Sequence, residues 1–149
     1  MRNSATIVKD AAGITTLAAL TALVFASPAS ATTYTRHVAV DCPPPYSQAC
    51  TPRQGITVGG SATPYYVRFT GDSSACAPGM VHIFVDGLEK GHSQVEPGQP
   101  AQFFNIQHGP GNSHTVDAQM GGVLGGCNTG AMSGWSGTLE VETDVDKGI

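Results

Sequence analysis

Four cysteines and five histidines are the side chains of this 149-residue sequence that could form covalent bridges or bind a metal ion. The cysteines are Cys42, Cys50, Cys76 and Cys127. An even number of cysteines in a small exported domain favours disulfides over metal thiolates. Four cysteines allow three pairings, and their spacing makes Cys42–Cys50 with Cys76–Cys127 the first choice. We therefore predict structural cysteines, and the other two pairings stay open.

The histidines lack the spacing that is typical of a metal site. No two of them stand in a His-x-His or His-x-x-x-His pattern. The alternative is a metal site in which His82, His114 and Met120 come together at one end of the fold. We expect ordinary surface or half-buried histidines, with no metal and no other cofactor. They are His37, His82, His92, His108 and His114.

The residue patterns of common hydrolases do not occur in this sequence. Ser136 lies in Gly134-Trp135-Ser136-Gly137, which lacks the spacing of a nucleophile elbow. Glu89, Glu96 and Asp117 occupy turns or outward strand positions, where a carboxyl group stays solvated and does not acquire the raised pKa of a catalytic acid. We expect a protein that is not an enzyme.

Residues 1–31 resemble a secretory signal peptide. Arg2 and Lys9 provide positive charge, an apolar run follows, and Ala29-Ser30-Ala31 forms a small-residue cleavage site. The clean apolar stretch, Ile14–Ala26, is shorter than the roughly 20 residues of a membrane-spanning helix. We predict cleavage after Ala31, which leaves residues 32–149 as one secreted domain.

The charge of the remaining chain excludes two classes of partner. Without the leader it contains five basic and ten acidic side chains, a formal charge of −5, with no cluster of lysine or arginine. Nucleic acids and anionic membranes attract basic surfaces, so we expect no nucleic-acid binding and no membrane insertion after cleavage. The expected partner is an extracellular protein or a glycan.

Short alternating apolar segments, separated by glycine, proline and asparagine, predict an all-β fold. Seven or eight strands fit an immunoglobulin-like sandwich. The expected strands are Thr35–Asp41, Gly55–Val58, Pro64–Thr70, Met80–Asp86, Gly91–Glu96, Ala101–Gln107, His114–Met120 and Gly137–Val145.

The two-residue period of a strand assigns one side chain in two to the core. Between two of the strands, Asp86-Gly87 favours a tight hairpin turn. The expected inward residues are Val38, Val40, Tyr65, Val67, Phe69, Val81, Ile83, Val85, Val116, Ala118, Leu139, Val141 and Val145.

Three segments resemble the middle of bacterial immunoglobulin-like extracellular modules. They are the strand Met80–Val85 with its Asp86-Gly87 end, then Pro97-Gly98, and then Gly111–Val116. The resemblance covers about forty residues and implies a binding or spacer module. The chain departs from antibody-type domains because Trp135, its one tryptophan, follows the last cysteine.

A second segment resembles the copper-binding end of a cupredoxin. Cys127 is followed by Met132 and then by Ser136–Val141. That family has a histidine between the cysteine and the methionine, and Asn128–Ala131 contains none. We therefore do not expect copper.

Two features could bind a partner. The ring from Cys42 to Cys50 contains three prolines and presents Tyr46, and a disulfide across it would hold it rigid. The second feature is a set of aromatic and polar residues that the strand period places outside the core, which suits a sugar or a peptide. The set comprises Tyr66, Arg68, His82, Phe84, Phe103 and Asn105.

Together these patterns predict a secreted, disulfide-bonded β-sandwich that acts by non-catalytic binding of a glycan or protein at or outside the cell surface. The alternative is a secreted inhibitor or effector of a foreign enzyme that presents the Cys42–Cys50 ring. Both hypotheses place Tyr46 in the binding surface.

Overall fold

The computed structural model of the chain describes residues 31–59, 65–129 and 131–143, and the statements below concern these residues. The expected signal peptide, apart from Ala31, and the expected core residue Val145 lie outside them. The eight strands are β1 (Thr32–Asp41), β2 (Gln54–Gly59), β3 (Tyr65–Gly71), β4 (Gly79–Val85), β5 (Leu88–Val95), β6 (Pro100–Ile106), β7 (Ser113–Gly122) and β8 (Gly134–Thr143).

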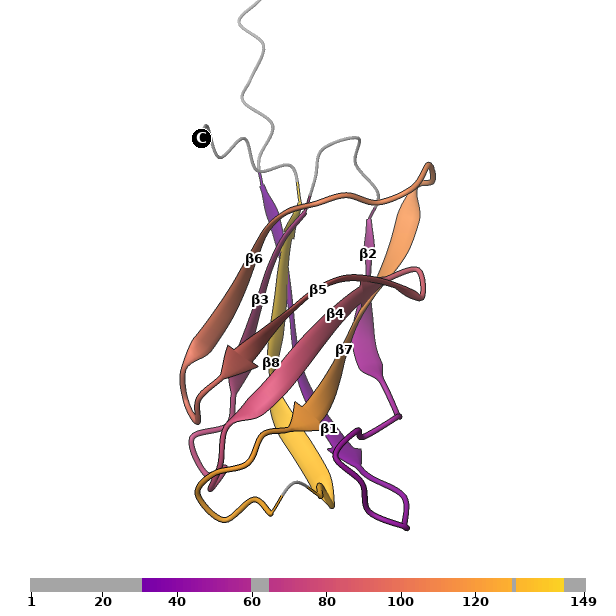
Figure 1. The fold of residues 1–149 in the computed structure, drawn as a ribbon. Coiled ribbons are helices and arrows are strands. Elements are labelled where there is room, and N and C mark those ends of the chain that lie inside the picture. Colours follow the sequence, from indigo (N-terminus) through magenta and orange to yellow (C-terminus); the bar gives the residue numbers. More distant parts are fainter. Residues whose placement is uncertain (1–30, 60–64, 130, 144–149) are drawn as a thin grey trace, which may run out of the picture.

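The strands form a sandwich of two four-stranded antiparallel sheets (Figure 1). The first sheet has the order β1-β8-β3-β6, and the second sheet has the order β2-β7-β4-β5. The expected all-β sandwich of eight strands is confirmed. Its strand order is that of a jelly roll, whereas immunoglobulin domains place strands A, B, E and D in one sheet and C, F and G in the other. The resemblance to immunoglobulin-like modules therefore extends to the architecture and not to the connections.

The core lies between the sheets and consists of the inward side chains of both. Every expected core residue in the described part of the chain is buried, with at most 8% of its surface exposed. Because successive side chains of a strand alternate between faces, the period-2 pattern was sufficient to find them. These residues are Val38, Val40, Tyr65, Val67, Phe69, Val81, Ile83, Val85, Val116, Ala118, Leu139 and Val141.

Four connections meet at one end of the sandwich (Figure 1). They are β1–β2 (residues 42–53), β3–β4 (72–78), β5–β6 (96–99) and β7–β8 (123–133). We call this the disulfide end, since all four cysteines lie in these connections. No helix in the described segments is long and apolar enough to cross a membrane.

The β4–β5 turn lies at the opposite end of the sandwich (Figure 1). Val85 pairs with Leu88, so the connection has two residues, Asp86 and Gly87, with φ values of 51° and 81°. Two positive φ values in a two-residue hairpin match a type I′ turn, which asparagine, aspartate and glycine favour. The tight turn expected at Asp86-Gly87 is confirmed.

Candidate functional site

Two disulfides fasten the connections of the disulfide end. Cys42 pairs with Cys50 within the β1–β2 connection, and Cys76 pairs with Cys127 between the β3–β4 and β7–β8 connections. Their Cα atoms are 5.3 and 5.6 Å apart, which is normal for a disulfide. The expected pairing is confirmed, and both bridges fit an oxidising compartment.

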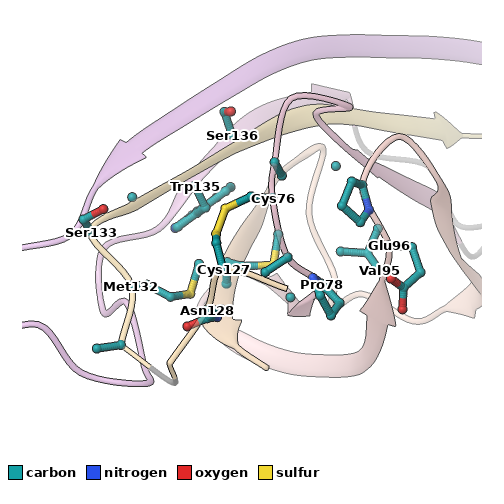
Figure 2. A pocket seen from close by; sticks show the side chains of 18 residues that line it. Cys76, Pro78, Val95, Glu96, Cys127, Asn128, Met132, Ser133, Trp135 and Ser136 are labelled. Carbon is teal, nitrogen blue, oxygen red and sulfur yellow. A yellow bond between two sulfur atoms is a disulfide. The ribbon is translucent and has the colours of Figure 1, made fainter. Parts of the chain in front are cut away.

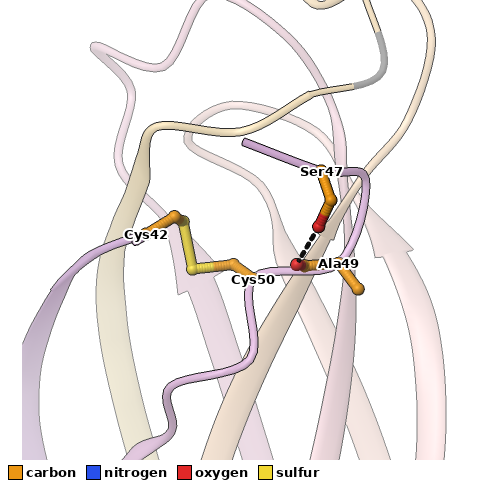
Figure 3. The surroundings of a disulfide bond; sticks show 4 residues. All are labelled: Cys42, Ser47, Ala49 and Cys50. Atoms are coloured by element: carbon orange, nitrogen blue, oxygen red, sulfur yellow. Dashed lines mark hydrogen bonds between the residues drawn. A yellow bond between two sulfur atoms is a disulfide. The ribbon is translucent and has the colours of Figure 1, made fainter. Parts of the chain in front are cut away.

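The Cys42–Cys50 ring is fixed to its neighbours by hydrogen bonds. Met132 N donates to Ser47 O at 3.0 Å, and Gly122 N donates to Gln48 O at 2.6 Å. The Gln48 side chain returns a bond from Nε2 to Gly122 O at 3.2 Å. Within the ring, Ser47 Oγ donates to Ala49 O at 2.7 Å (Figure 3). The ring is therefore a rigid part of the disulfide end, and it carries Tyr46 with 56% of its surface exposed.

A cavity of about 270 Å³ opens among the β3–β4, β5–β6 and β7–β8 connections (Figure 2). Its apolar wall contains the Cys76–Cys127 bridge and the side chains of Met132 and Trp135. The polar lining comprises Glu96, Asn128, Ser133 and Ser136. A second hollow of about 450 Å³ shares Ser133–Ser136 with it, so the start of β8 is flanked by two depressions.

Trp135 has an unusual environment at this cavity. Its ring packs edge-on against Phe69, with centroids 6.0 Å apart, which anchors it to the core. Its Nε1 atom is buried and has no hydrogen-bond partner among the described residues. A buried indole N–H normally finds an acceptor, so an unpartnered one beside a cavity is unusual. In the sequence, Trp135 stands out only as a departure from antibody domains, and no motif around it predicts a place in the site.

A serine, an aspartate and a histidine meet beside the cavity, but not in the order of a catalytic triad. Ser136 Oγ donates to Asp72 Oδ2, and His37 Nε2 lies 3.3 Å from the same carboxylate oxygen. The pKa of Asp72 is lowered, mainly by the hydrogen bond from the Ser136 hydroxyl. Burial acts in the opposite direction, and His37 lowers the pKa further. In a triad the histidine stands between serine and aspartate and takes the proton of the hydroxyl. Here the aspartate stands in the middle, so the three side chains link β1, β8 and the β3–β4 connection. We call this group, His37, Asp72 and Ser136, the polar clamp.

The expected aromatic surface is not one surface. Tyr66 and Arg68 point outward from the first sheet, whereas His82 and Phe84 belong to the second sheet. These outward residues therefore do not form one aromatic face, because the outer faces of the two sheets lie on opposite sides of the sandwich.

Neighbouring side chains also cover the outward aromatic rings. The Phe104 ring lies 5.0 Å from the Tyr66 ring, and the Arg53 guanidinium lies 3.5 Å from the centre of the Phe84 ring. Arg68 Nη1 pairs with Glu140 Oε2 at 3.3 Å. Tyr66 and Phe84 are therefore buried although they face away from the core. Any role of these residues in binding stays a prediction.

Phe103 was expected to face outward, and this prediction is wrong. Val67 pairs with Phe103 and Tyr65 pairs with Ile106, so β6 contains one residue more than β3 over this interval. Such a β-bulge resets the alternation and brings both Phe103 and Ile106 into the core. Asn105, in the bulge, is exposed and has a φ of 56°.

His114 is buried, which corrects the expectation of surface or half-buried histidines for this residue. The other four histidines are exposed or half-buried as expected. The proposed group of His82, His114 and Met120 does not form. His114 and Met120 lie six positions apart on β7, about 20 Å along a strand, and Met120 lines the cavity at the disulfide end.

One group of residues could hold a metal ion in the described part of the chain. His82, Glu89 and His92 offer ligand atoms that lie within 4.8 Å of one another. Of these three residues, only His82 was a candidate ligand from the sequence, because residues 82, 89 and 92 follow no ligand motif. Cross-strand pairing brings the group together.

No protein-family model and no curated protein matches the sequence. Several solved structures resemble this chain, and two of them are CBM36 domains. The CBM36-1 domain of a multidomain xylanase from the hindgut metagenome of Trinervitermes trinervoides has 14% identity and a TM-score of 0.47, with 75% of this chain and 96% of that domain covered. A carbohydrate-binding module CBM36 in complex with calcium and xylotriose has 13% identity and a TM-score of 0.48, with 74% and 98% covered.

Proposed function

We propose that this protein is a secreted, non-catalytic binding module that takes a neutral glycan in the cavity of the disulfide end. The observation that carries the proposal is Trp135, which lines that cavity and whose buried indole N–H has no hydrogen-bond partner among the described residues. A sugar supplies what this position needs, because its ring has an apolar face and its hydroxyl oxygens accept hydrogen bonds.

The lining favours an uncharged, hydroxyl-rich ligand. Of the described residues around the cavity, Glu96 alone carries a charge, and its Oε1 already accepts a bond from Gln94 Nε2 at 2.8 Å. Asn128 and Ser133 add amide and hydroxyl groups, and Trp135 and Met132 add apolar surface. The volume of about 270 Å³ is near the lower end for ligand pockets, which suits one sugar ring at a chain end.

The rigidity of the disulfide end also supports binding. Loops that a scaffold holds in one geometry lose little entropy when a ligand binds. Both disulfides and the bonds of Ser47 and Gln48 hold the connections that form the cavity. Binding without hydrolysis agrees with the clamp at Asp72, in which Ser136 has no histidine partner.

Tryptophan fluorescence tests the proposal directly, since Trp135 is the one tryptophan of the chain. Titration with a panel of neutral oligosaccharides should shift or quench its emission for at least one of them. Met132→Ala, and Trp135→Phe followed by calorimetry, should each weaken that binding about tenfold or more. Leu124→Ala is a matched control at an exposed apolar residue of the same connection and should bind normally. Absence of any response across the panel, or equal binding by all variants, would contradict the proposal.

The exposed Tyr46 on the fastened ring favours a second candidate, an inhibitor of a foreign protease. A rigid loop with one large exposed side chain suits insertion into a cleft. A screen against secreted proteases with the unchanged protein and with Tyr46→Ala distinguishes the two. Inhibition that Tyr46→Ala removes, without any glycan response at Trp135, would favour the inhibitor.

A further inference from the structure

Two histidines of the second sheet converge on one carboxylate oxygen. His82 Nδ1 lies 2.8 Å and His92 Nδ1 lies 3.1 Å from Glu89 Oε1. The imidazole rings are 5.2 Å apart, and the ligand atoms of all three residues lie within 4.8 Å of one another. Two nitrogen donors and one oxygen donor therefore surround a single point on the protein surface.

The β4–β5 ladder explains how these residues meet. His82 and His92 are directly paired across the two strands. Glu89 is three residues before His92, and in a regular strand an odd separation places side chains on opposite faces. The ladder shifts between Ile83 and Phe84, so that Phe84 pairs with Glu89 and Lys90 is the extra residue.

This bulge determines which way Glu89 points. Without the extra residue, Glu89 would pair with Val85 and would share its inward face. With it, Glu89 pairs with Phe84 and joins His82 and His92 on the outer face. Bulges that re-aim a side chain are frequent beside functional sites. The cluster thus depends on a specific feature of the backbone.

We propose that His82, Glu89 and His92 form a binding site for a divalent transition-metal ion of the zinc class. Imidazole nitrogens with one carboxylate suit Zn²⁺ and its neighbours, whereas Ca²⁺ and Mg²⁺ prefer all-oxygen ligands. Bonds of about 2.0 Å in a tetrahedron place the ligand atoms roughly 3.3 Å apart, so the two nitrogen–oxygen separations of 2.8 and 3.1 Å need only a small expansion. The fourth position faces solvent, because 42% of the Glu89 side chain and 61% of the His92 side chain are exposed.

The surrounding residues on this face leave the cluster accessible. Gln119 is opposite His82 on β7, and its Oε1 accepts a bond from Arg53 Nε at 3.2 Å. That bond, together with the contact over Phe84, occupies the Arg53 guanidinium. The site is on the face of a sheet and the proposed glycan cavity is at the disulfide end, so each can be tested without the other.

Zinc binding by the oxidised protein tests this proposal. Isothermal titration with Zn²⁺ near pH 7.5 should give one site. His82→Ala and His92→Ala should each weaken binding at least a hundredfold, and Glu89→Gln about tenfold. Co²⁺ in place of zinc should give the visible spectrum of a four-coordinate site, and His92→Ala should abolish it.

His37→Ala is the matched control, because His37 is an exposed histidine beside a single carboxylate, Asp72, without a second imidazole. It should bind zinc like the unchanged protein. All three ligand residues are exposed or half-buried, so circular dichroism should show folded variants. The proposal is overturned if the unchanged protein binds no zinc, or if the three substitutions affect binding no more than His37→Ala.

Discussion

The buried imidazole of His114 donates from Nδ1 to Asp86 Oδ2 at 2.6 Å, at the turn between β4 and β5. The second oxygen of Asp86 accepts a bond from Thr115 N at 3.0 Å. One carboxylate in a positive-φ turn thus joins the β4–β5 hairpin to the start of β7. This contact fixes the end of the sandwich that is opposite the disulfides.

The first prediction concerns acid stability at this turn. The bond to His114, then that from Thr115, lowers the pKa of Asp86 in the folded protein. When a carboxyl group has a lower pKa in the folded than in the unfolded protein, it stabilises the fold at pH values above the unfolded pKa, which is near 3.9 for aspartate. This stability is lost as the pH falls through the pKa of the folded protein. Asparagine tolerates the backbone conformation of Asp86, so Asp86→Asn removes only the charge. Because the Asp86 side chain is 45% exposed, the substitution should lower the free energy of unfolding by only about 1 kcal/mol at pH 7, and by less at pH 3.

Urea unfolding at both pH values measures this effect. Asp41→Asn is the control, because Asp41 is an exposed aspartate for which the structure gives no side-chain hydrogen bond. An equal loss for Asp86→Asn at pH 3 and pH 7 would show that the ionised carboxylate adds nothing.

The second prediction concerns the clamp at Asp72. Ser136 is the larger cause of the lowered pKa of Asp72, and His37 is a smaller one. Ser136→Ala should therefore raise the Asp72 pKa toward its usual value by more than His37→Ala does. Carboxyl chemical shifts followed by NMR between pH 2 and pH 6 would measure both variants. The reverse order would contradict the role given to the serine hydroxyl.

The fold was predictable because burial in a sandwich follows a two-residue period. Val81, Ile83 and Val85 alternate with polar or covered residues, and both sheets follow this rule over most of their length. The strand order was not predictable from that period. The rule gives the inward face of each strand and says nothing of which strands become neighbours.

The two bulges mark where the reading of individual residues failed. At each, one extra residue breaks the alternation. Phe103 faces inward in step with Ala101, and the bulge after it brings Ile106 inward too, whereas the bulge at Lys90 turns Glu89 outward. A bulge has no fixed sequence signal, so Phe103 was assigned to the wrong face, and Glu89 was expected to be solvated but not to lie beside two histidines. The spacing of the cysteines favoured the observed disulfide pairing among the three possible ones, but did not exclude the other two.

The third prediction concerns close packing at Gly137. A Cβ atom there would meet the Phe69 ring and Thr70 O, and Phe69 is fully buried against Trp135. Gly137→Ala should destabilise the fold by about 1–3 kcal/mol, as overpacking of a core does. Gly109→Ala is the matched control, since a Cβ atom at Gly109 meets nothing within 4 Å. Thermal unfolding of both variants would measure the difference, and similar midpoints would contradict the crowding.

The fourth prediction separates the two disulfides. Cys76–Cys127 links residues 51 positions apart and Cys42–Cys50 links residues 8 apart. In the loop-entropy model, removal of the longer link costs roughly 4 kcal/mol and removal of the shorter about 2.5 kcal/mol, both upper figures. Paired serine substitutions, followed by urea unfolding, should show that order.

Because the longer bridge also forms part of the cavity wall beside Trp135, its removal should weaken the glycan response more than removal of the Cys42–Cys50 bridge. Equal losses of stability and of binding would mean that the two bridges act alike, and would count against the cavity as the binding site.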